Sequence, residues 1–328
     1  MSDITVSVEG RDRAQQLAPP QPTVVVLIPC YNEAVAIGRV VADFRVSLPD
    51  ARIFVYDNNS SDDTTAVARR AGAVVRAESL QGKGNVVRRM FADIEADIYV
   101  LVDGDDTYDA AAAPHMIRLM REQQLDMVSG ARIDAVIEAY RPGHRLGNAL
   151  LTGMVRRLFG KRITDVLSGY RVFSRRFVKS FPALATGFET ETEFSVHALE
   201  LRLPIAELPT QYRGRPPGST SKLRTYADGW RILRTIVVLV KDERPLQFFS
   251  LAGAVMLLSG AGLAVPVLLE FMRTGLVPRL PTAILATALV LLSFQSFACG
   301  LILDSVSRGR KEIKRLAYLG TPARHSQG

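Results

Sequence analysis

Two long stretches without a charged side chain constrain the fold of this chain more than any other feature. They run from Leu246 to Leu269 and from Pro281 to Leu303. Each is long enough to cross a hydrocarbon core of about 30 Å as a helix that rises about 1.5 Å per residue. We therefore predict two transmembrane helices, residues 246–272 and 281–303, with a short connection between them. Pro266 is tolerated inside a membrane helix and is expected to kink it.

Basic residues beside the two stretches predict which side of the membrane each end occupies. They are Arg224, Arg231, Arg234, Lys241 and Arg244 before the first stretch, Arg308, Arg310, Lys311, Lys314 and Arg315 after the second, and Arg273 and Arg279 in the connection. Because Lys and Arg are retained on the cytoplasmic side, both termini are predicted to be cytoplasmic, in a multi-pass protein of the inner membrane. The net charge of +8 comes largely from these flanks, so it indicates an anionic membrane surface rather than a nucleic acid.

The sequence also predicts the character of the two terminal segments and of the cysteines. Residues 1–22 are polar and contain no apolar run, so they are expected to form a flexible tail without a secretory signal. Residues 304–328 are expected to form a basic cytoplasmic tail. Cys30 and Cys299 fall in different compartments of the predicted topology, so no disulfide is expected.

Residues 23–224 are predicted to form a cytoplasmic α/β domain. Apolar runs of strand length alternate there with segments of helical spacing. The expected strands are Val24–Ile28, Ile53–Tyr56, the segment AVVRAES and the segment IYVLV, and the expected helices are 34–48, 64–71 and 86–94. Such alternation is typical of an open, mostly parallel sheet, which binds ligands outside the carboxyl ends of its strands.

Three of these carboxyl ends carry polar sequences: PCYNE at 29–33, DNNSSDD at 57–63 and DGDD at 103–106. One polar strand end is an ordinary turn, whereas three at one sheet edge predict a binding site. Asp103 and Asp105 follow a buried strand two residues apart, where their like charges repel. A Mg²⁺ or Mn²⁺ ion offsets this repulsion, with Gly104 leaving room between the aspartates, and it stabilises the charge of a departing diphosphate.

The segment QGKGN at 81–85 has two interpretations. It lacks the GxxxxGKS/T and GxGxxG spacings, so neither a P-loop ATPase nor a dinucleotide-binding protein is indicated. Gly82 and Gly84 at a helix N-terminus, together with the charge of Lys83, suit a diphosphate. An ordinary glycine-bounded loop accounts for the stretch equally well.

Several motifs follow one another in order between Val24 and Arg244. They are IPCYNE, DNNSSDDT, GKGN, DGDD, SGARI, DVLSGYRVF, GFETETE and GSTSKL. As an ordered set they resemble glycosyltransferase family 2, and within it the polyprenyl-phosphate branch similar to dolichyl-phosphate mannose synthase, some of whose members carry a two-helix tail. The chain departs from the family's common DDGSxDGT at Asn58 and Asp63, and its loop from Arg215 to Lys222 is one residue longer than is common.

The resemblance implies a glycosyltransferase A-type, Rossmann-like sheet, followed by an interfacial helix and the transmembrane hairpin. It implies that the nucleotide sugar is bound by Pro29, Tyr31, Glu33, Asp57, Lys83 and Asp103, and the metal by Asp103 and Asp105. It implies that the acceptor phosphate is bound by Arg132, Arg145, Arg213, Arg215, Ser221 and Lys222. The implied reaction is an inverting transfer of a hexose from a UDP- or GDP-sugar to undecaprenyl or dolichyl phosphate, which gives a lipid-linked sugar donor for glycan assembly.

A lipid phosphate acceptor changes which catalytic groups are expected. A phosphate monoester carries a charge of about −1.5 to −2 near pH 7, so it needs positioning and charge neutralisation rather than a general base. The resemblance implies Asp105, Arg132 and Glu191 as the residues that supply these effects. Glu191 belongs to GFETETE, which forms either a strand edge or a helix start, and its alternative role is to complement a helix dipole. The histidines are interpreted as surface or core residues, namely His115, His144, His197 and His325.

Residues 225–245 predict an amphipathic juxtamembrane helix. Its apolar face carries Tyr226 and Trp230, and basic side chains occupy the neighbouring face. This pattern is typical of an interfacial helix with aromatic rings at headgroup depth. A helix packed on its own domain is the alternative.

Two other functions share parts of this sequence pattern. A processive or glycan-directed family 2 transferase shares the fold, but a processive synthase is expected to carry a QxxRW element. Trp230 is followed by Arg231 but preceded by Ala227, Asp228 and Gly229, so that element is missing. A non-catalytic membrane scaffold that only binds nucleotide sugar is disfavoured by the intact Asp103 and Asp105. A homo-oligomer is compatible with the sequence.

Overall fold

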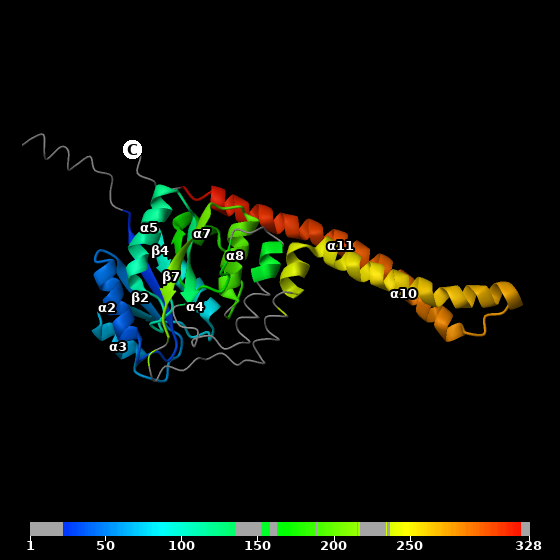
Figure 1. Ribbon diagram of the computed structural model, residues 1–328, viewed down its shortest axis with the longest axis horizontal. Helices are drawn as coiled ribbons and strands as arrows, with labels where there is room; N and C mark the ends of the chain where they lie inside the picture. Colours follow the sequence, from blue (N-terminus) through cyan, green and yellow to red (C-terminus); the bar gives the residue numbers. More distant parts are fainter. Residues whose placement is uncertain are drawn as a thin grey trace, which may run out of the picture. The chain divides into compact units, whose positions relative to one another are not determined.

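The structure is a computed structural model that describes residues 22–134, 152–157, 163–187, 189–214, 216, 234 and 237–322 (Figure 1). The chain divides into two compact units. The first contains Met1–Lys222 together with Ala317–Gly328, and the second contains Leu223–Leu316.

A seven-stranded sheet forms the centre of the first unit. Its strands are β1 (Val24–Cys30), β2 (Arg52–Asp57), β3 (Val74–Ala77), β4 (Ile98–Leu101), β5 (Met127–Asp134), β6 (Arg171–Ser174) and β7 (Ile205–Tyr212). Their order across the sheet is β3-β2-β1-β4-β6-β5-β7. β6 runs antiparallel to β4 and β5, and the other neighbours are parallel. The prediction of a mostly parallel sheet is therefore confirmed, and six strands end at the same edge.

Helices cover both faces of this sheet (Figure 1). They are α2 (Ile37–Ser47), α3 (Thr64–Arg70), α4 (Lys83–Asp93), the short 3₁₀ helix η1 (Ala110–Ala112), α5 (Ala113–Glu122), α7 (Arg175–Ser180) and α8 (Thr190–Glu200). α2, α3 and α5 share one apolar core with Val26 and Val100. Because side chains alternate along a strand, Tyr99 faces the opposite side, where aromatic rings of α4, α7 and α8 pack around Phe173.

Two predicted helix starts can be compared with the structure. α4 begins at Lys83, within the glycine-flanked QGKGN segment as expected, and its N-cap Gly82 adopts a φ of 129° that few other residues accept. Gly84 then packs so closely that an added Cβ would lie 2.1 Å from the carbonyl oxygen of Ala185. The GFETETE segment is a helix start, since α8 begins at Thr190.

The second unit contains most of a helical hairpin. α10 spans Pro245–Thr274 and continues through Pro266, and α11 spans Leu280–Leu319. Both are long and apolar enough to cross a membrane. α11 extends well past residue 303, so the first part of the predicted basic tail is helical. Of the predicted juxtamembrane helix, residues 237–243 are helical, whereas Tyr226 and Trp230 lie outside the described residues.

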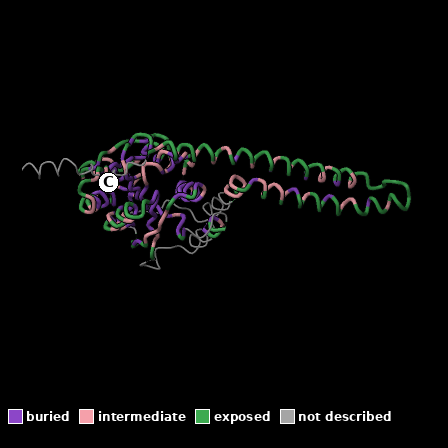
Figure 2. Tube along the Cα trace, turned by 90° about the horizontal axis from the view of Figure 1, so that it is seen from above, coloured by how far each residue is buried: buried purple, intermediate pink, exposed green. Residues whose placement is uncertain are grey.

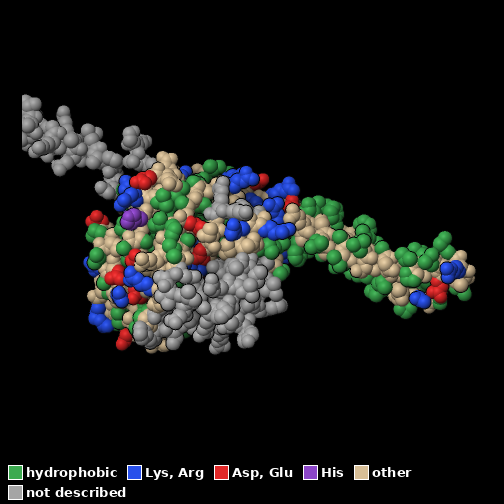
Figure 3. Space-filling model, in the orientation of Figure 1, with side chains coloured by type: hydrophobic (Ala, Val, Ile, Leu, Met, Phe, Trp, Pro, Cys, Tyr) green, Lys and Arg blue, Asp and Glu red, His purple; other side chains and the backbone are tan. Residues whose placement is uncertain are grey.

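Buried positions recur every seven residues along the two hairpin helices (Figure 2). After the buried Pro245 at the start of α10, they are Gly253, Gly260 and Val267 in α10, and Ala286, Ser293, Gly300 and Ser307 in α11. Small side chains let two helix backbones approach closely. The large apolar side chains point outward instead, and Figure 3 shows them between charged groups at the two ends of the hairpin.

Candidate active site

The carboxyl edge of the sheet brings most of the predicted site residues together. Glu33 follows β1, Asp57 ends β2, and Asp103 and Asp105 follow β4. β5 and β7 run in the same direction, so Arg132 and Arg213 belong to this edge as well. The acidic and basic groups that the sequence singled out therefore share one side of one sheet.

Hydrogen bonds join the loops that follow β1, β2 and β3. The Asn32 side chain accepts a hydrogen bond from the Ser61 amide at 2.7 Å. The Asn58 amide group donates to the carbonyl oxygens of Glu78 and Leu80 at 2.9 and 2.8 Å, and its oxygen accepts from Gly82 N at 2.7 Å. Asn58, a departure from the common family motif, thus fixes the start of the QGKGN segment.

The residues predicted for the base and ribose pocket surround these loops. Pro29 lies within β1, and Tyr31 just after it has a side chain that is 38% exposed. Glu33 and Asp57 are buried. Asp57 Oδ2 accepts from Ser60 N at 3.1 Å, whereas its buried Oδ1 has no hydrogen-bond partner among the residues that the structure describes. An unpartnered carboxylate oxygen at this edge is a position where a ligand hydroxyl or amide would be bound.

Lys83 bridges two carboxylates at the centre of the edge. Its Nζ lies 2.5 Å from Asp103 Oδ1 and also pairs with Glu191 Oε1. Burial opposes the charged ammonium, but the two carboxylates outweigh burial and raise the pKa of Lys83. Burial raises the pKa of Glu191, against the opposing charge of Lys83. The ammonium therefore stays charged and offsets part of the acidic charge.

Two glycines shape the surroundings of the aspartates. Gly104 packs against the core, because an added Cβ there would lie 2.6 Å from Cys30 Sγ. The glycine that makes space beside Asp103 is Gly169, where a Cβ would lie 2.3 Å from Asp103 Oδ2. Asp105 is buried, and its Oδ1 accepts from Thr107 Oγ1 at 2.6 Å.

The two described arginines of the acceptor set have acidic partners. Arg132 forms two hydrogen bonds with Asp165, at 2.7 Å from Nε and 2.8 Å from Nη2. Although burial favours the neutral acid, Arg132 holds the pKa of Asp165 below its usual range. Arg213 Nη2 lies 3.5 Å from Asp109 Oδ1. The other predicted members of this set, Arg145, Arg215, Ser221 and Lys222, lie outside the described residues.

Aromatic side chains connect the aspartates with Arg132. Gly169 N, next to Asp103, donates to Tyr108 Oη at 2.9 Å. The Tyr108 ring packs on the Tyr212 ring with centroids 5.3 Å apart. The Arg132 guanidinium carbon lies 5.5 Å from the centroid of Tyr212. The two aspartates predicted to bind the metal and the guanidinium of Arg132 are therefore parts of one contiguous site.

The described histidines occupy the surface and core positions expected of them. His115 is exposed on α5. His197 is buried between the rings of Phe177 and Phe181, and its Nε2 lies 3.0 Å from Ser180 Oγ. His144 and His325 lie outside the described residues.

Sequence reasoning missed Asp165 and Gly169. Both belong to DVLSGYRVF, a motif used for the resemblance without any of its residues being singled out. An aspartate and a glycine shortly before a strand were the available signal. Their partners, Arg132 and Asp103, come from distant parts of the chain, so only the fold identifies the pairs.

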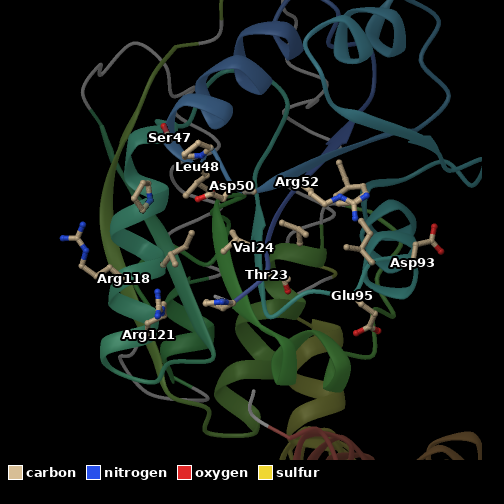
Figure 4. Close-up of a pocket in the computed structure, with 18 of the residues that line it drawn as sticks. Thr23, Val24, Ser47, Leu48, Asp50, Arg52, Asp93, Glu95, Arg118 and Arg121 are labelled. Carbon is tan, nitrogen blue, oxygen red and sulfur yellow. The ribbon is translucent and has the colours of Figure 1, made fainter. Parts of the chain in front are cut away.

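A large cavity lies away from this site. It has a volume of about 1220 Å³, and its lining includes Thr23, Arg52 and Arg121 (Figure 4). Thr23 precedes β1 and Arg52 begins β2, so the cavity borders the amino ends of these strands. The predicted site is at the opposite edge of the sheet.

A solved structure has the same arrangement of strands and helices. Glucosyl-3-phosphoglycerate synthase from Mycobacterium tuberculosis, in complex with Mn²⁺, UDP and glucosyl-3-phosphoglycerate, gives a TM-score of 0.55 at 22% identity, covering 74% of this chain and 86% of that one. The likeness shows the shared fold. The first unit therefore has the glycosyltransferase A-type fold.

Sequence comparison identifies the family. The family model described as Glycosyl transferase family 2 matches residues 25–181. Glycosyltransferase AglJ of Haloferax volcanii is 32% identical over 308 residues, which cover 92% of this chain and 99% of that protein. The dolichyl-phosphate hexose transferase of the same organism is 31% identical over 221 residues, which cover 67% of this chain and 94% of that protein. The chain belongs to glycosyltransferase family 2.

Proposed function

We propose that this enzyme transfers a hexose, with inversion, from a UDP- or GDP-sugar to a polyprenyl phosphate at a membrane. The observation that carries the proposal is the shared sheet edge, which holds Asp103 and Asp105 together with Arg132 in a chain with two membrane-length helices. The name of the dolichyl-phosphate hexose transferase supports a lipid phosphate acceptor. The UDP bound by glucosyl-3-phosphoglycerate synthase supports a nucleotide-sugar donor.

The aspartates suit a divalent ion that shares its ligands with a diphosphate. Among the described residues no group of three or more His, Cys, Asp or Glu side chains could hold a metal by itself. Mg²⁺ and Mn²⁺ need only one or two protein carboxylates when phosphate oxygens and waters complete the coordination. Asp103 and Asp105 would hold the ion, which when bound neutralises the charge that develops on the leaving diphosphate. Mn²⁺ in the glucosyl-3-phosphoglycerate synthase complex supports this cofactor.

The other residues would bind and orient the two substrates. Glu33 and the unpartnered oxygen of Asp57 would bind the nucleoside part of the donor. Arg132 and Arg213 would hold the acceptor phosphate in line with the anomeric carbon and neutralise its repulsion from the donor. Glu191, kept beside Asp103 by Lys83, would accept a hydrogen bond from a sugar hydroxyl. A lipid phosphate is already anionic, so no side chain needs to remove a proton.

The hairpin would bring this site to its lipid substrate. In this proposal residues 23–224 are the cytoplasmic transferase domain, residues 225–245 form the juxtamembrane helix, and both termini are cytoplasmic. The transferase domain would then be tethered to the membrane that contains the polyprenyl phosphate. The outward apolar side chains of α10 and α11 support insertion into a bilayer.

The replacement Asp105→Ala tests the proposal. With purified protein, labelled nucleotide sugars, Mg²⁺ or Mn²⁺ and undecaprenyl phosphate, we expect the wild type to move label into organic-extractable lipid. Asp105→Ala should lower this rate about a thousandfold, because the charge on the leaving diphosphate is no longer stabilised. Asp50→Ala, an exposed aspartate at the other edge of the sheet, is the control and should keep the wild-type rate.

Three outcomes would contradict the proposal. Wild-type turnover by Asp105→Ala would remove the metal role. Label that enters a polymer instead of lipid would indicate a processive transferase. Donor binding without any transfer would indicate a nucleotide-sugar-binding scaffold.

A further inference from the structure

We infer that Asp165 is a positioning residue that orients Arg132 for the phosphate group of the acceptor. The inference rests on the proposed function, because it concerns the group that Arg132 would bind. The observations that carry it are the geometry of the Arg132–Asp165 pair and the bonds that hold Asp165 in place.

The pair fixes the plane of the Arg132 guanidinium. Arg132 Nε and Nη2 each donate to a different oxygen of Asp165, at 2.7 and 2.8 Å. The backbone N of Arg132 donates to the same carboxylate at 3.3 Å. The side chains are only 13% and 10% exposed. Two parallel charge-assisted bonds set the orientation of a planar group in a way that one bond cannot.

Asp165 is itself held in place by Glu207 of β7, the strand beside β5. Glu207 Oε1 accepts from Asp165 N at 3.2 Å, and Glu207 Oε2 accepts from the amide and hydroxyl of Thr164 at 2.8 and 2.7 Å. Glu207 pairs in register with Ser129 of β5, the strand that carries Arg132. The carboxylate and the arginine that it orients therefore have a common rigid support.

The residues after Asp165 are held just as firmly. Arg171 is fully buried at the start of β6, and it donates to Val166 O at 2.7 Å and to Ser168 O at 3.0 Å. Gly169 then follows, against the carboxylate of Asp103. Residues 165–169 are thus held rigidly at both ends. Asp165 orients Arg132 on the acceptor side of the site, and Gly169 leaves space beside Asp103 on the donor side.

This arrangement fits a phosphate monoester better than a diffuse anionic surface. Arginine recognises phosphate through paired N–H groups in a fixed fork, whereas a mobile cation acts only as a point charge. Asp165 accepts from the Nε edge of the guanidinium and so sets the plane in which the group would meet a phosphate. Asp165 also adds negative charge, and by charge alone it would weaken anion binding. Orientation and charge therefore predict opposite effects of its removal.

The experiment compares Asp165→Asn with the wild type, using the full chain in nanodiscs. The readouts are the Kd for farnesyl phosphate and the separate KM values for undecaprenyl phosphate and for the nucleotide sugar. If Asp165 orients Arg132, the Kd and the lipid KM should both rise about tenfold, the loss expected for one hydrogen bond to a charged group. The nucleotide-sugar KM should stay within about twofold, which a general loss of folding would not produce.

Two further variants make the comparison specific. Asp93→Asn is the matched control, because Asp93 also binds arginine, with Arg89 Nε at 2.9 Å, but belongs to the opposite edge of the sheet. It should leave all three constants unchanged. Asp165→Glu keeps the charge and displaces the carboxylate by one methylene, so it should show the same loss and carries the test if Asp165→Asn does not fold.

The possible results separate this inference from the proposed function. An unchanged or lower Kd for farnesyl phosphate in Asp165→Asn would overturn the inference, because the aspartate would then only compete with the phosphate. Wild-type values for Asp165→Glu would overturn it as well. Farnesyl phosphate binding by the wild type without sugar transfer would contradict the proposed function, while the Kd comparison would still decide the inference. A wild type that does not bind farnesyl phosphate would overturn the inference itself.

Discussion

At the scale of single residues, the structure explains why Asn58 departs from the family's common DDGSxDGT motif. Its amide nitrogen donates to two carbonyl oxygens that follow β3, while its oxygen accepts from Gly82 N. A carboxylate could keep the bond from Gly82 but could not donate to the carbonyls of Glu78 and Leu80. The amide at position 58 is therefore what joins the loop after β2 to the segment that carries Lys83.

Asn58→Asp should loosen this segment. The buried side chain would lose two donated hydrogen bonds and face two carbonyl oxygens, at a cost of about 2 kcal/mol. The opening constant of the segment should rise about thirtyfold, measured as faster hydrogen exchange at the amides of Gly82 and Asn85. Asn59→Asp is the control, since Asn59 also donates to this loop but is exposed, and its effect should be several times smaller. Equal effects of the two variants would contradict this account.

At the scale of elements, the sequence predicts the strands that are simplest in composition. β1, β4 and the central part of β2 are continuous apolar runs because helices cover both of their faces. β6 gave no such signal, since it begins with the fully buried Arg171, whose charge is stabilised by the carbonyl oxygens of Val166 and Ser168. Burial lowers the pKa of Arg171 to about 10, which still leaves it charged at neutral pH.

The residues of the candidate site also divide into those that the sequence could predict and those that it could not. Residues at the ends of the apolar strands could be predicted, because parallel strands bring their carboxyl ends to one edge. The pairs that connect the acidic and basic halves of the site could not, because Asp165 meets Arg132 and Gly169 meets Asp103 only through the antiparallel β6. A strand that reverses direction brings residues to this edge at its start rather than at its end.

The hairpin helices offer a test of packing at the same scale. An added Cβ at Gly260 would lie 3.0 Å from Ala286 O and 3.1 Å from Leu289 Cβ, whereas Gly262 has nothing within 4 Å. Gly260→Ile should therefore separate the helices and destabilise the hairpin by about 1–3 kcal/mol. Gly262→Ile should be neutral or slightly stabilising, because isoleucine has the higher helix propensity. Unfolding of the two variants in mixed micelles measures the difference, and equal stabilities would exclude close packing at Gly260.

At the scale of the whole molecule, the distribution of charge relates the hairpin to the membrane. Basic residues flank both outer ends of the hairpin, from Arg224 to Arg244 and from Arg308 to Arg315. The connection has only Arg273 and Arg279, and Arg279 pairs with Glu270 at 3.3 Å. This asymmetry favours an orientation with the connection outside and both termini in the cytoplasm, where nucleotide sugars would reach the carboxyl edge of the sheet.

Cysteine labelling tests this orientation with a matched pair of positions. Leu276 in the connection and Leu319 at the end of α11 are 68% and 69% exposed, so differences in labelling will report the side of the membrane rather than burial. With Cys30 and Cys299 replaced by serine, a membrane-impermeant maleimide added to intact cells should label Leu276→Cys and not Leu319→Cys. After lysis both should react equally. The reverse pattern would separate the transferase domain from cytoplasmic nucleotide sugars, and labelling of both positions in intact cells would be incompatible with a hairpin whose two ends share the cytoplasmic side.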